Sequence, residues 1–263
     1  MDLGLSGRTV VITGGTSGIG LAAAGIFLDE GARVAICGRN GERLDKVAAD
    51  LGGRFGAANV LARRCDVTKQ DDVAAFARDV EGWSGGVDIL INNAGQGQMT
   101  TFASTTDEQW RHELDLKFFS QIYPVRAFKP LLDKSDTAAI LAVNALLAYQ
   151  PESYMVCTSA ARAGVQNLIK SLAREFAPRI RVNAVLLGLV DSGQWQRRFA
   201  AREDQSQSRD AWYADLARSR HIPLERLGHP EEVASAIAFL CSPAASFITG
   251  AQLEISGGAS RYM

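Results

Sequence analysis

The 263-residue sequence has no excess of charge of either sign, because 28 lysines and arginines are balanced by 29 aspartates and glutamates. A protein that binds nucleic acid or an anionic membrane through its surface field needs a basic excess. We therefore expect neither as a partner. The sequence also lacks a hydrophobic run of the roughly 20 residues that a membrane-spanning helix needs. Its longest apolar stretch, residues 138–149, contains Asn144.

Cysteines are few, and they follow no recognisable pattern. They lie far apart and show no metal-ligand spacing, so we expect neither disulfides nor a zinc site: Cys37, Cys65, Cys157 and Cys241. The N-terminal stretch carries the acidic Asp2 and no cleavable apolar core, which predicts a cytoplasmic protein.

Short β-rich runs alternate with longer segments whose apolar residues recur near a 3.6-residue period. We predict strands at 9–13, 33–37, 60–65, 88–92, 138–144, 180–187 and 252–255. Helices are predicted at 18–30, 41–51, 70–81, 107–132, 152–176 and 230–241. This order is typical of βαβ units. We expect one α/β domain over residues 1–263, with a doubly wound parallel sheet of about seven strands and helices on both faces.

Residues 194–220 depart from this alternation, because they are dense in Arg, Asp and Gln and their main apolar residues are aromatic. We expect an exposed helical excursion that serves as a substrate lid. Arg197 and Arg198 in such a lid would suit an anionic substrate. The alternative is that both arginines simply lie on a solvated helix face, where charged residues are common.

The first predicted strand runs directly into a glycine-rich turn, Gly14-Gly15-Thr16-Ser17-Gly18-Ile19-Gly20, and a helix follows at once. Such a turn lets backbone N–H groups and the helix N-terminus approach a pyrophosphate closely. A plain tight turn is the alternative interpretation. The place of the turn in the first βαβ unit favours a dinucleotide site.

With this turn, further motifs make the chain resemble the short-chain dehydrogenase/reductase family from end to end: Cys65-Asp66-Val67, Asn92-Asn93-Ala94-Gly95, Ile180-Arg181-Val182-Asn183, and a tail from Ser246 to Gly258. The resemblance implies a single-domain Rossmann-type fold, an oxidoreductase activity and a nicotinamide cofactor held by the glycine-rich turn. One departure is Leu187, where the family usually has proline before the glycine.

The resemblance also assigns the rest of the cofactor site. It implies that Asp66 and Val67 hold the adenine ring and that Val190 and Ser192 reach the nicotinamide end. It further implies that residues 92–95 back the cofactor, including Asn92, Ala94 and Gly95.

The end of the second strand indicates which dinucleotide binds. An acid there would bind the ribose hydroxyls of NAD, but this chain has Gly38 followed by Arg39. A guanidinium pairs with a 2′-phosphate in bidentate fashion, so we expect NADP(H) rather than NAD(H). The alternative is a solvated loop arginine. The basic residue that some NADP-preferring members carry in the glycine-rich turn is absent, because Ser17 stands there.

The part of the site that would carry out the reaction differs from the family at all four of its catalytic positions. Active members use Asn, Ser, Tyr and Lys. Matching the helix around Ala163-Gly164 places Thr158 at the Tyr position and Arg162 at the Lys position. The Ser position, in the loop after its strand, falls on Ala145, and the Asn position falls on Lys117. A threonine hydroxyl cannot ionise near neutral pH as a lysine-tuned phenol can, and a permanently charged guanidinium does not relay protons.

Two side chains are candidates for the missing acid. Tyr154 lies four residues before Thr158 and shares a predicted helix face with Thr158 and Arg162, so its phenol could be displaced by one turn. An ordinary packing residue is the alternative. Lys117 could supply a cation or a proton, although a lysine on a long helix is usually a surface residue.

These observations predict an NADP-dependent oxidoreductase that acts on a small carbonyl or alcohol with low or atypical activity. The alternative is a catalytically silent NADP-binding protein, a sensor or a structural subunit. Both would bind NADPH, and only the first would turn over. The resemblance also implies a homo-oligomer, a tetramer, in which helices 107–132 and 152–176 pair through Leu114, Phe118, Val165 and Leu168.

Overall fold

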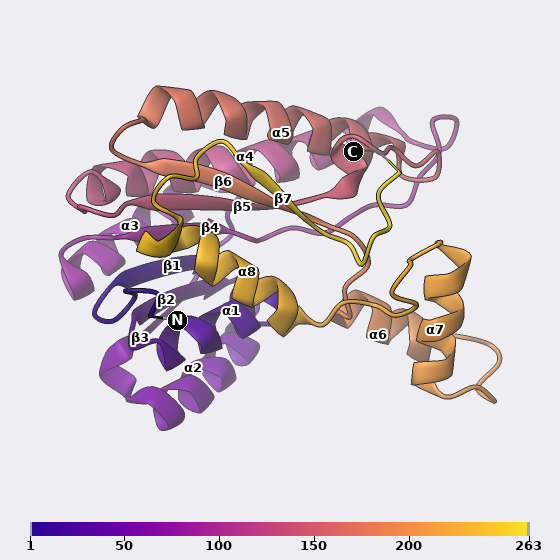
Figure 1. The fold of residues 1–263 in the computed structure, drawn as a ribbon, viewed down its shortest axis with the longest axis horizontal. Helices are drawn as coiled ribbons and strands as arrows, with labels where there is room; N and C mark the ends of the chain where they lie inside the picture. Colours follow the sequence, from indigo (N-terminus) through magenta and orange to yellow (C-terminus); the bar gives the residue numbers. More distant parts are fainter. Residues whose placement is uncertain (1, 262–263) are drawn as a thin grey trace.

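In the computed structural model, which describes residues 2–261, seven strands alternate with helices (Figure 1). The strands are β1 (Thr9–Thr13), β2 (Arg33–Gly38), β3 (Val60–Arg64), β4 (Ile89–Asn92), β5 (Ala139–Ala145), β6 (Arg181–Leu187) and β7 (Gln252–Ile255). The helices are α1 (Gly18–Asp29), α2 (Gly41–Phe55), α3 (Gln70–Ser84), α4 (Asp107–Leu132), α5 (Val156–Phe176), α6 (Gly193–Ala200), α7 (Arg209–Ser219) and α8 (Pro230–Cys241). Each strand boundary lies within one residue of its prediction.

The strands form one parallel sheet in the order β3-β2-β1-β4-β5-β6-β7. The chain first adds strands on one side of β1 and then crosses to build β4 to β7 on the other. The carboxyl ends of β1 and β4 therefore flank a topological switch point, where ligands bind in sheets of this kind. The predicted fold class is confirmed.

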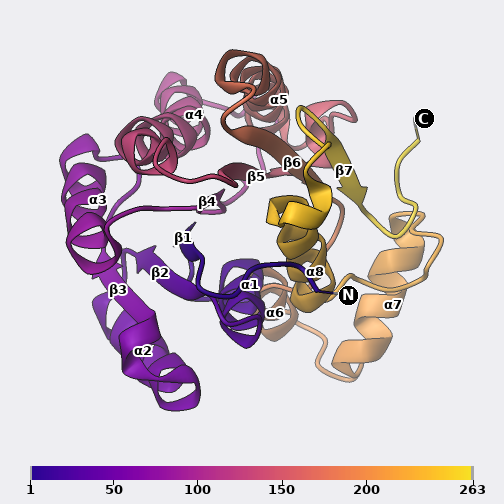
Figure 2. The same cartoon turned by 60° about the vertical axis from the view of Figure 1, so that its left-hand side comes forward.

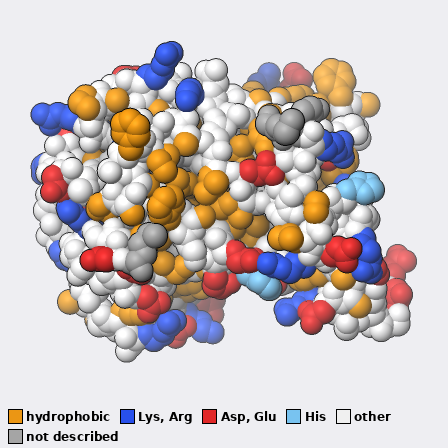
Figure 3. Space-filling model, in the orientation of Figure 1, with side chains coloured by type: hydrophobic (Ala, Val, Ile, Leu, Met, Phe, Trp, Pro, Cys, Tyr) orange, Lys and Arg blue, Asp and Glu red, His pale blue; other side chains and the backbone are white. Residues whose placement is uncertain are grey.

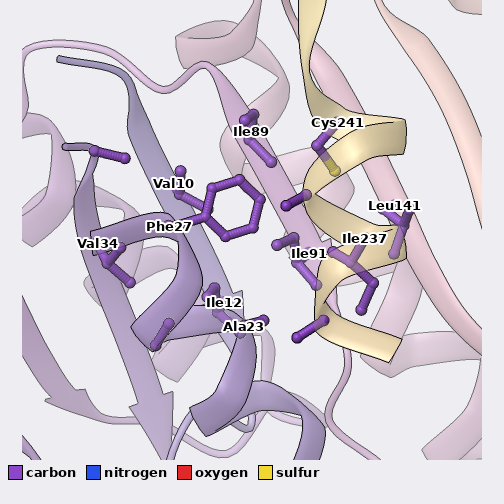
Figure 4. Packing of buried hydrophobic residues seen from close by; sticks show 14 of the residues in the cluster. Val10, Ile12, Ala23, Phe27, Val34, Ile89, Ile91, Leu141, Ile237 and Cys241 are labelled. Carbon is purple, nitrogen blue, oxygen red and sulfur yellow. The ribbon is translucent and has the colours of Figure 1, made fainter. Parts of the chain in front are cut away.

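Helices cover both faces of the sheet, with α1, α2 and α8 on one and α3, α4 and α5 on the other (Figure 2). Successive strand residues point to opposite faces, so Val10 and Ile12 pack with the first group of helices while Val11 packs with the second. Figure 4 shows Phe27 of α1 lying among Val10 and its neighbours in the first layer. This packing of both faces explains why the strands are apolar along their length.

Three helix predictions were wrong by about a turn. Helix α2 continues through Gly52 and Gly53 to Phe55, and α3 continues to Ser84, where Gly85 ends it with a φ of 77°. Helix α5 begins at Val156 rather than at 152, because the residues before it pair with another loop. Met155 bridges Thr100, and the Val156 N–H donates to the Thr100 carbonyl at 3.2 Å.

Helices α6 and α7 lie beyond the sheet (Figure 1) and account for most of residues 194–220. The expectation of an exposed excursion was only partly right, because the segment has a small core of its own. Tyr213 and Ala217 are buried with Ile222 and Leu227, and the rings of Trp195 and Trp212 lie 6.3 Å apart. This segment therefore packs on itself and on the residues that follow it, in a cluster separate from the two layers on the sheet.

The four cysteines are free and buried. Within residues 2–261, none of the helices has the length and apolar character needed to cross a bilayer.

Candidate active site

The glycine-rich turn after β1 is built so tightly that side chains are excluded at three positions, Gly14, Gly15 and Gly20. A Cβ on Gly20 would lie 2.4 Å from the Gly14 carbonyl oxygen, and a Cβ on Gly14 would lie 2.9 Å from the Ala94 Cα. Gly18, at the first turn of α1, has a φ of 52° and open space where a Cβ would be. An exposed helix N-terminus with no side chain over it fits a pyrophosphate.

The loops after β1 and β4 are fastened together by hydrogen bonds. The Thr13 hydroxyl oxygen accepts from the backbone N–H groups of Asn93 and Ala94 at 3.0 and 3.1 Å. The Asn93 side-chain amide donates to the Thr13 and Gly14 carbonyls at 3.0 and 3.1 Å. Asn93 is thus a positioning residue for the cradle, a role that the sequence did not assign to it.

Asn92, at the end of β4, is fully buried. Neither polar atom of its side chain makes a hydrogen bond with any other part of residues 2–261. A buried amide left without partners is destabilising, so this position suits a polar ligand or ordered water at the crevice.

Two arginines, not one, lie near the end of β2. Arg39 is exposed just beyond β2, and the Arg64 Nε donates to the Arg39 carbonyl at 3.2 Å. Arg64 was not predicted to bind the cofactor, although it ends β3 and pairs in register with Gly38. The signal that could have found it was the parallel pairing of β2, which is followed by Arg39, with β3, which ends at Arg64.

Asp66 lies close to these arginines and has a structural task of its own. Its carboxylate accepts from the Thr68 hydroxyl and backbone N–H at 2.7 and 3.1 Å. Partial burial acts to raise the pKa of Asp66, but the Thr68 hydrogen bonds and the charge of Arg39 outweigh it, so the pKa is lowered. Val67 is buried against the sheet. The side chains of this motif thus shape the loop beside the adenine position.

The remaining residues that were predicted to bind the cofactor lie near the ends of β1, β2 and β6. Thr16 packs against Gly38, since a Cβ there would lie 2.9 Å from the Thr16 Cγ2. Val190 is buried and bridges Gly228, while Ser192 is the N-cap residue of α6. The two residues predicted for the nicotinamide end therefore lead into the 194–220 segment.

Thr158 is almost completely buried, with 1% of its surface exposed. Its hydroxyl lies 2.5 Å from the Glu113 Oε1 and 3.2 Å from the Gln98 carbonyl, and it accepts from the Gln98 N–H at 3.0 Å. A hydroxyl has one hydrogen to donate. The Thr158 hydrogen is therefore already directed at an acceptor inside the protein.

Lys117 is buried too, which contradicts the interpretation that it is a surface lysine. Its Nζ lies 2.8 Å from the Glu113 Oε1 and also donates to the Gln96 carbonyl. Burial lowers the pKa of Lys117 and the charge of Arg162 lowers it further, while Glu113 opposes both. An ammonium with a lowered pKa releases its proton more readily near neutral pH.

Glu113 joins these side chains and was missed by the sequence analysis. It lies on α4 one turn before Lys117, is 1% exposed, and receives hydrogen bonds from both Lys117 and Thr158 at one oxygen. The signal for it was the four-residue spacing from Lys117, the lysine that the sequence analysis predicted at a catalytic position.

Arg162 holds the end of β5. Its guanidinium donates to the Val143 carbonyl at 2.9 Å and to the Asn144 Oδ1 at 3.3 Å, and its Nε is buried without a partner among residues 2–261. Burial lowers the pKa of Arg162 to about 10. Ala145, which was predicted at the family's serine position, is the last residue of β5 and not a residue of the following loop as expected. Its methyl group can neither donate nor accept a hydrogen bond.

Tyr154 does not share a helix face with Thr158 and Arg162, because it lies in the turn before α5. Its hydroxyl accepts from Arg220 at 2.5 Å, and the Arg220 guanidinium lies 5.0 Å from the centre of the ring. Burial raises the pKa of Tyr154, and the charge of Arg220 opposes this. The structure thus brings Lys117, Thr158 and Arg162 together around Glu113 and places Tyr154 against the end of α7.

The chain is similar to known oxidoreductases over almost its whole length. A family described as enoyl-(acyl carrier protein) reductase matches residues 14–260. An uncharacterised oxidoreductase, YvrD of Bacillus subtilis, is 33% identical over the whole of both chains. The chain belongs to the short-chain dehydrogenase/reductase family.

Two solved proteins of the family show the same fold. A short-chain oxidoreductase of Pseudomonas aeruginosa, described as containing an atypical catalytic center, is 53% identical with a TM-score of 0.95 over all of both chains. Its NADPH-bound structure has a TM-score of 0.92 and 54% identity over 97% of this chain and 98% of that one. L-Sorbose reductase of Gluconobacter frateurii, solved with NADPH and L-sorbose, is 32% identical with a TM-score of 0.95 over all of both chains.

Proposed function

We propose that this protein is an NADP(H)-dependent oxidoreductase that acts on a small carbonyl or alcohol. The side-chain-free cradle at Gly14 to Gly20 supports dinucleotide binding, and the adjacent arginines 39 and 64 support a 2′-phosphate. The NADPH complexes of the Pseudomonas and Gluconobacter relatives point the same way. NADPH would supply the hydride for carbonyl reduction.

The proton would come from Lys117. The observation that carries this proposal is the cluster at Glu113, which accepts from Lys117, while the hydrogen of Thr158 is already directed at Glu113 or at the Gln98 carbonyl. Two of the three N–H groups of the Lys117 ammonium are directed at Glu113 and at the Gln96 carbonyl, which leaves one for a substrate, and its pKa is lowered. It donates a proton to the carbonyl oxygen, which becomes the product hydroxyl, and the resulting amine takes a proton from solvent.

Arg162 and Thr158 then have supporting tasks. Arg162 keeps a positive charge at the end of β5 through its bonds to Val143 and Asn144, in the place where the family's lysine stands. Thr158 fastens the loop containing Gln98 to Glu113. Neither task requires the side chain to ionise.

The test is the pH profile of NADPH oxidation with a panel of small aldehydes and ketones. Lys117→Met should reduce kcat by about 100-fold or more, the usual worth of a general acid. Lys129→Met is the matched control, because that lysine lies on the same helix and pairs at the surface with Asp133 at 2.7 Å. It should leave kcat unchanged.

For the wild-type protein, kcat for reduction should fall as the pH rises through the lowered pKa of Lys117, since the acid must be protonated. Two outcomes contradict the proposal. An unchanged profile in Lys117→Met would rule out the lysine as acid. NADPH binding with no turnover of any carbonyl or alcohol would support the silent-binder alternative.

We also propose that the protein is a homo-oligomer, a tetramer. Leu114 on α4 is 39% exposed and Leu253 on β7 is 41% exposed, which leaves apolar surface for a second copy. Val165 is not available for this role, because it is buried in the layer between α5 and the sheet. Light scattering at micromolar concentration tests the proposal, and a mass of one chain, 28.2 kDa, would contradict it.

A further inference from the structure

Two arginines of the 194–220 segment contact residues that lie next to the cluster around Glu113. Arg220, just after α7, donates to the Tyr154 hydroxyl and lies over its ring. Arg198, on α6, donates to the Met99 sulfur at 2.7 Å, and its guanidinium lies 4.5 Å from the centre of the Trp195 ring. The positive charges of both arginines lower the pKa of Tyr154 and oppose the effect of its burial.

Within residues 2–261, neither guanidinium forms an ion pair, in contrast to Arg209 and Arg218 of the same segment. Arg218 pairs with Asp215, one turn away, and Arg209 approaches Asp210 at 3.8 Å. Arg198 and Arg220 instead use a thioether and a phenol, which are weak, uncharged acceptors. Figure 3 shows charged side chains gathered over the part of the molecule that contains α7.

The contacts of these arginines lead directly to the proposed acid. Met99 belongs to the loop of residues 96–100, in which the Gln96 carbonyl accepts from Lys117 and the Gln98 N–H donates to Thr158. Thr100 of the same loop bridges Met155, the residue after Tyr154. Arg198 and Arg220 therefore lie on the far side of one short loop and one turn from the reacting groups.

One carboxylate lies near this cluster and has to be weighed. The negative charge of Glu152 raises the pKa of Tyr154, whereas the charges of the two arginines lower it. Its carboxylate forms no ion pair with either arginine. Its backbone N–H donates to the Ser159 hydroxyl at 3.4 Å. Two cations against one carboxylate leave a local positive excess, which favours an anionic ligand.

We propose that Arg198, Arg220 and Tyr154 form an anion subsite that binds an oxyanion group, carboxylate or phosphate, of the substrate. The guanidinium fork of each arginine matches the two oxygens of such a group, and the phenol adds one donor. The substrate is then a carbonyl compound with an anionic end, and its carbonyl is directed at Lys117. This inference rests on the proposed function, whose carbonyl substrate it specifies.

The kinetic test compares short keto acids with their methyl esters, which differ chiefly in charge, using NADPH and the intact protein. Each acid should have a KM at least about tenfold below that of its ester, the effect of one charge-assisted hydrogen bond. Arg198→Gln and Arg220→Gln should raise KM for the acid by about tenfold, leave kcat nearly unchanged and leave the ester unaffected. Phosphate-bearing ketones with the lower KM would identify phosphate as the anion.

Two controls separate local charge from general effects. Arg197→Gln removes an exposed charge next to Arg198, and Arg218→Gln removes an arginine that already has a partner. Both should leave KM for the acids within about twofold, as expected for surface charges. Equal KM values for acid and ester, or equal losses in the control variants, would overturn the proposal. Thermal melting of each variant checks that it is folded.

Calorimetry separates this proposal from the proposed function. The probe is the saturated carboxylic acid of the same length, which carries the anion but no carbonyl, titrated into the NADPH-loaded protein. Binding that Arg220→Gln abolishes supports the subsite even when no carbonyl is reduced, in which case only the proposed function fails. Reduction of neutral ketones without binding of the acid overturns the subsite and leaves the proposed function standing.

Discussion

The candidate site has two halves that are built differently: the cofactor half is the turn from Gly14 to Gly20, and the chemical half is the cluster around Glu113. Around Gly14 and Gly20 the site is backbone, shaped by positions where a side chain has no room. Around Lys117 and Thr158 it is made of side chains that meet at the carboxylate of Glu113. A backbone site keeps its shape while its neighbours vary, whereas a side-chain site changes its chemistry with each substitution. Resemblance to a family therefore describes the first half far better than the second.

The comparison is tested most severely at Glu113. Glu113→Gln leaves Lys117 and Arg162 without their shared negative charge, and breaking a buried ion pair destabilises by about 3–5 kcal/mol. Urea denaturation at neutral pH should show this loss in the free energy of unfolding. Asp115→Asn, an exposed carboxylate on the same helix, is the control and should stay within about 0.5 kcal/mol of the wild type. Equal small losses would mean that Glu113 does not hold the cluster together.

The loss in Glu113→Gln should depend on pH with a definite sign. Burial lowers the pKa of Lys117 below its unfolded value, so the unfolded chain binds more protons in the window between the two pKa values. Stability therefore rises with pH across that window. Without Glu113 the folded pKa falls further, so the rise should begin at lower pH and be larger. Denaturation curves from neutral to alkaline pH check this, and parallel pH profiles for the two proteins would contradict it.

Prediction from sequence succeeded where local pattern decides the structure. The strands and the glycine-rich turn follow from apolar runs and from glycine, so both could be predicted with only small errors at element ends. The position of Tyr154 could not, because the start of α5 is set by a bridge between Thr100 and Met155, far apart in sequence. Glu113 was missed for the same reason. Its role depends on α4 packing so that Lys117 and Thr158 point at one oxygen.

The cofactor half is tested next at its arginines. Arg39→Gln should weaken NADPH binding by about 1.5–3 kcal/mol, the usual worth of a hydrogen bond to a charged group, and should leave NADH binding unchanged. Arg64→Gln should act in the same direction. Fluorescence titration of both nucleotides measures the preference. Arg63→Gln is the control, since Arg63 pairs with Asp79 at 2.8 Å. Equal wild-type affinities for NADPH and NADH would contradict the assignment.

The backbone character of the cradle can be tested with two glycines of one helix. Gly20→Ala places a Cβ 2.4 Å from a carbonyl oxygen and should destabilise by about 1–3 kcal/mol, with weaker NADPH binding. Gly25→Ala meets nothing within 4 Å and should stabilise by about 0.5–1 kcal/mol, because alanine favours a helix interior. Thermal melting with and without NADPH separates the two effects. A cradle that accepts alanine at both positions would remove the contrast between the halves.

The smallest effect is expected at Thr158, the residue that was predicted at the tyrosine position. Thr158→Val keeps the shape of the side chain and removes a hydroxyl whose hydrogen is directed at Glu113 or Gln98. If Lys117 is the acid, kcat should fall by no more than about threefold, far less than the roughly 100-fold or greater loss of a general acid. Thr158→Ser retains the hydroxyl and separates its loss from a packing effect. A large fall in Thr158→Val that Thr158→Ser restores would make the threonine hydroxyl the proton donor. The chemical half would then work by a neutral alcohol rather than by a buried ammonium.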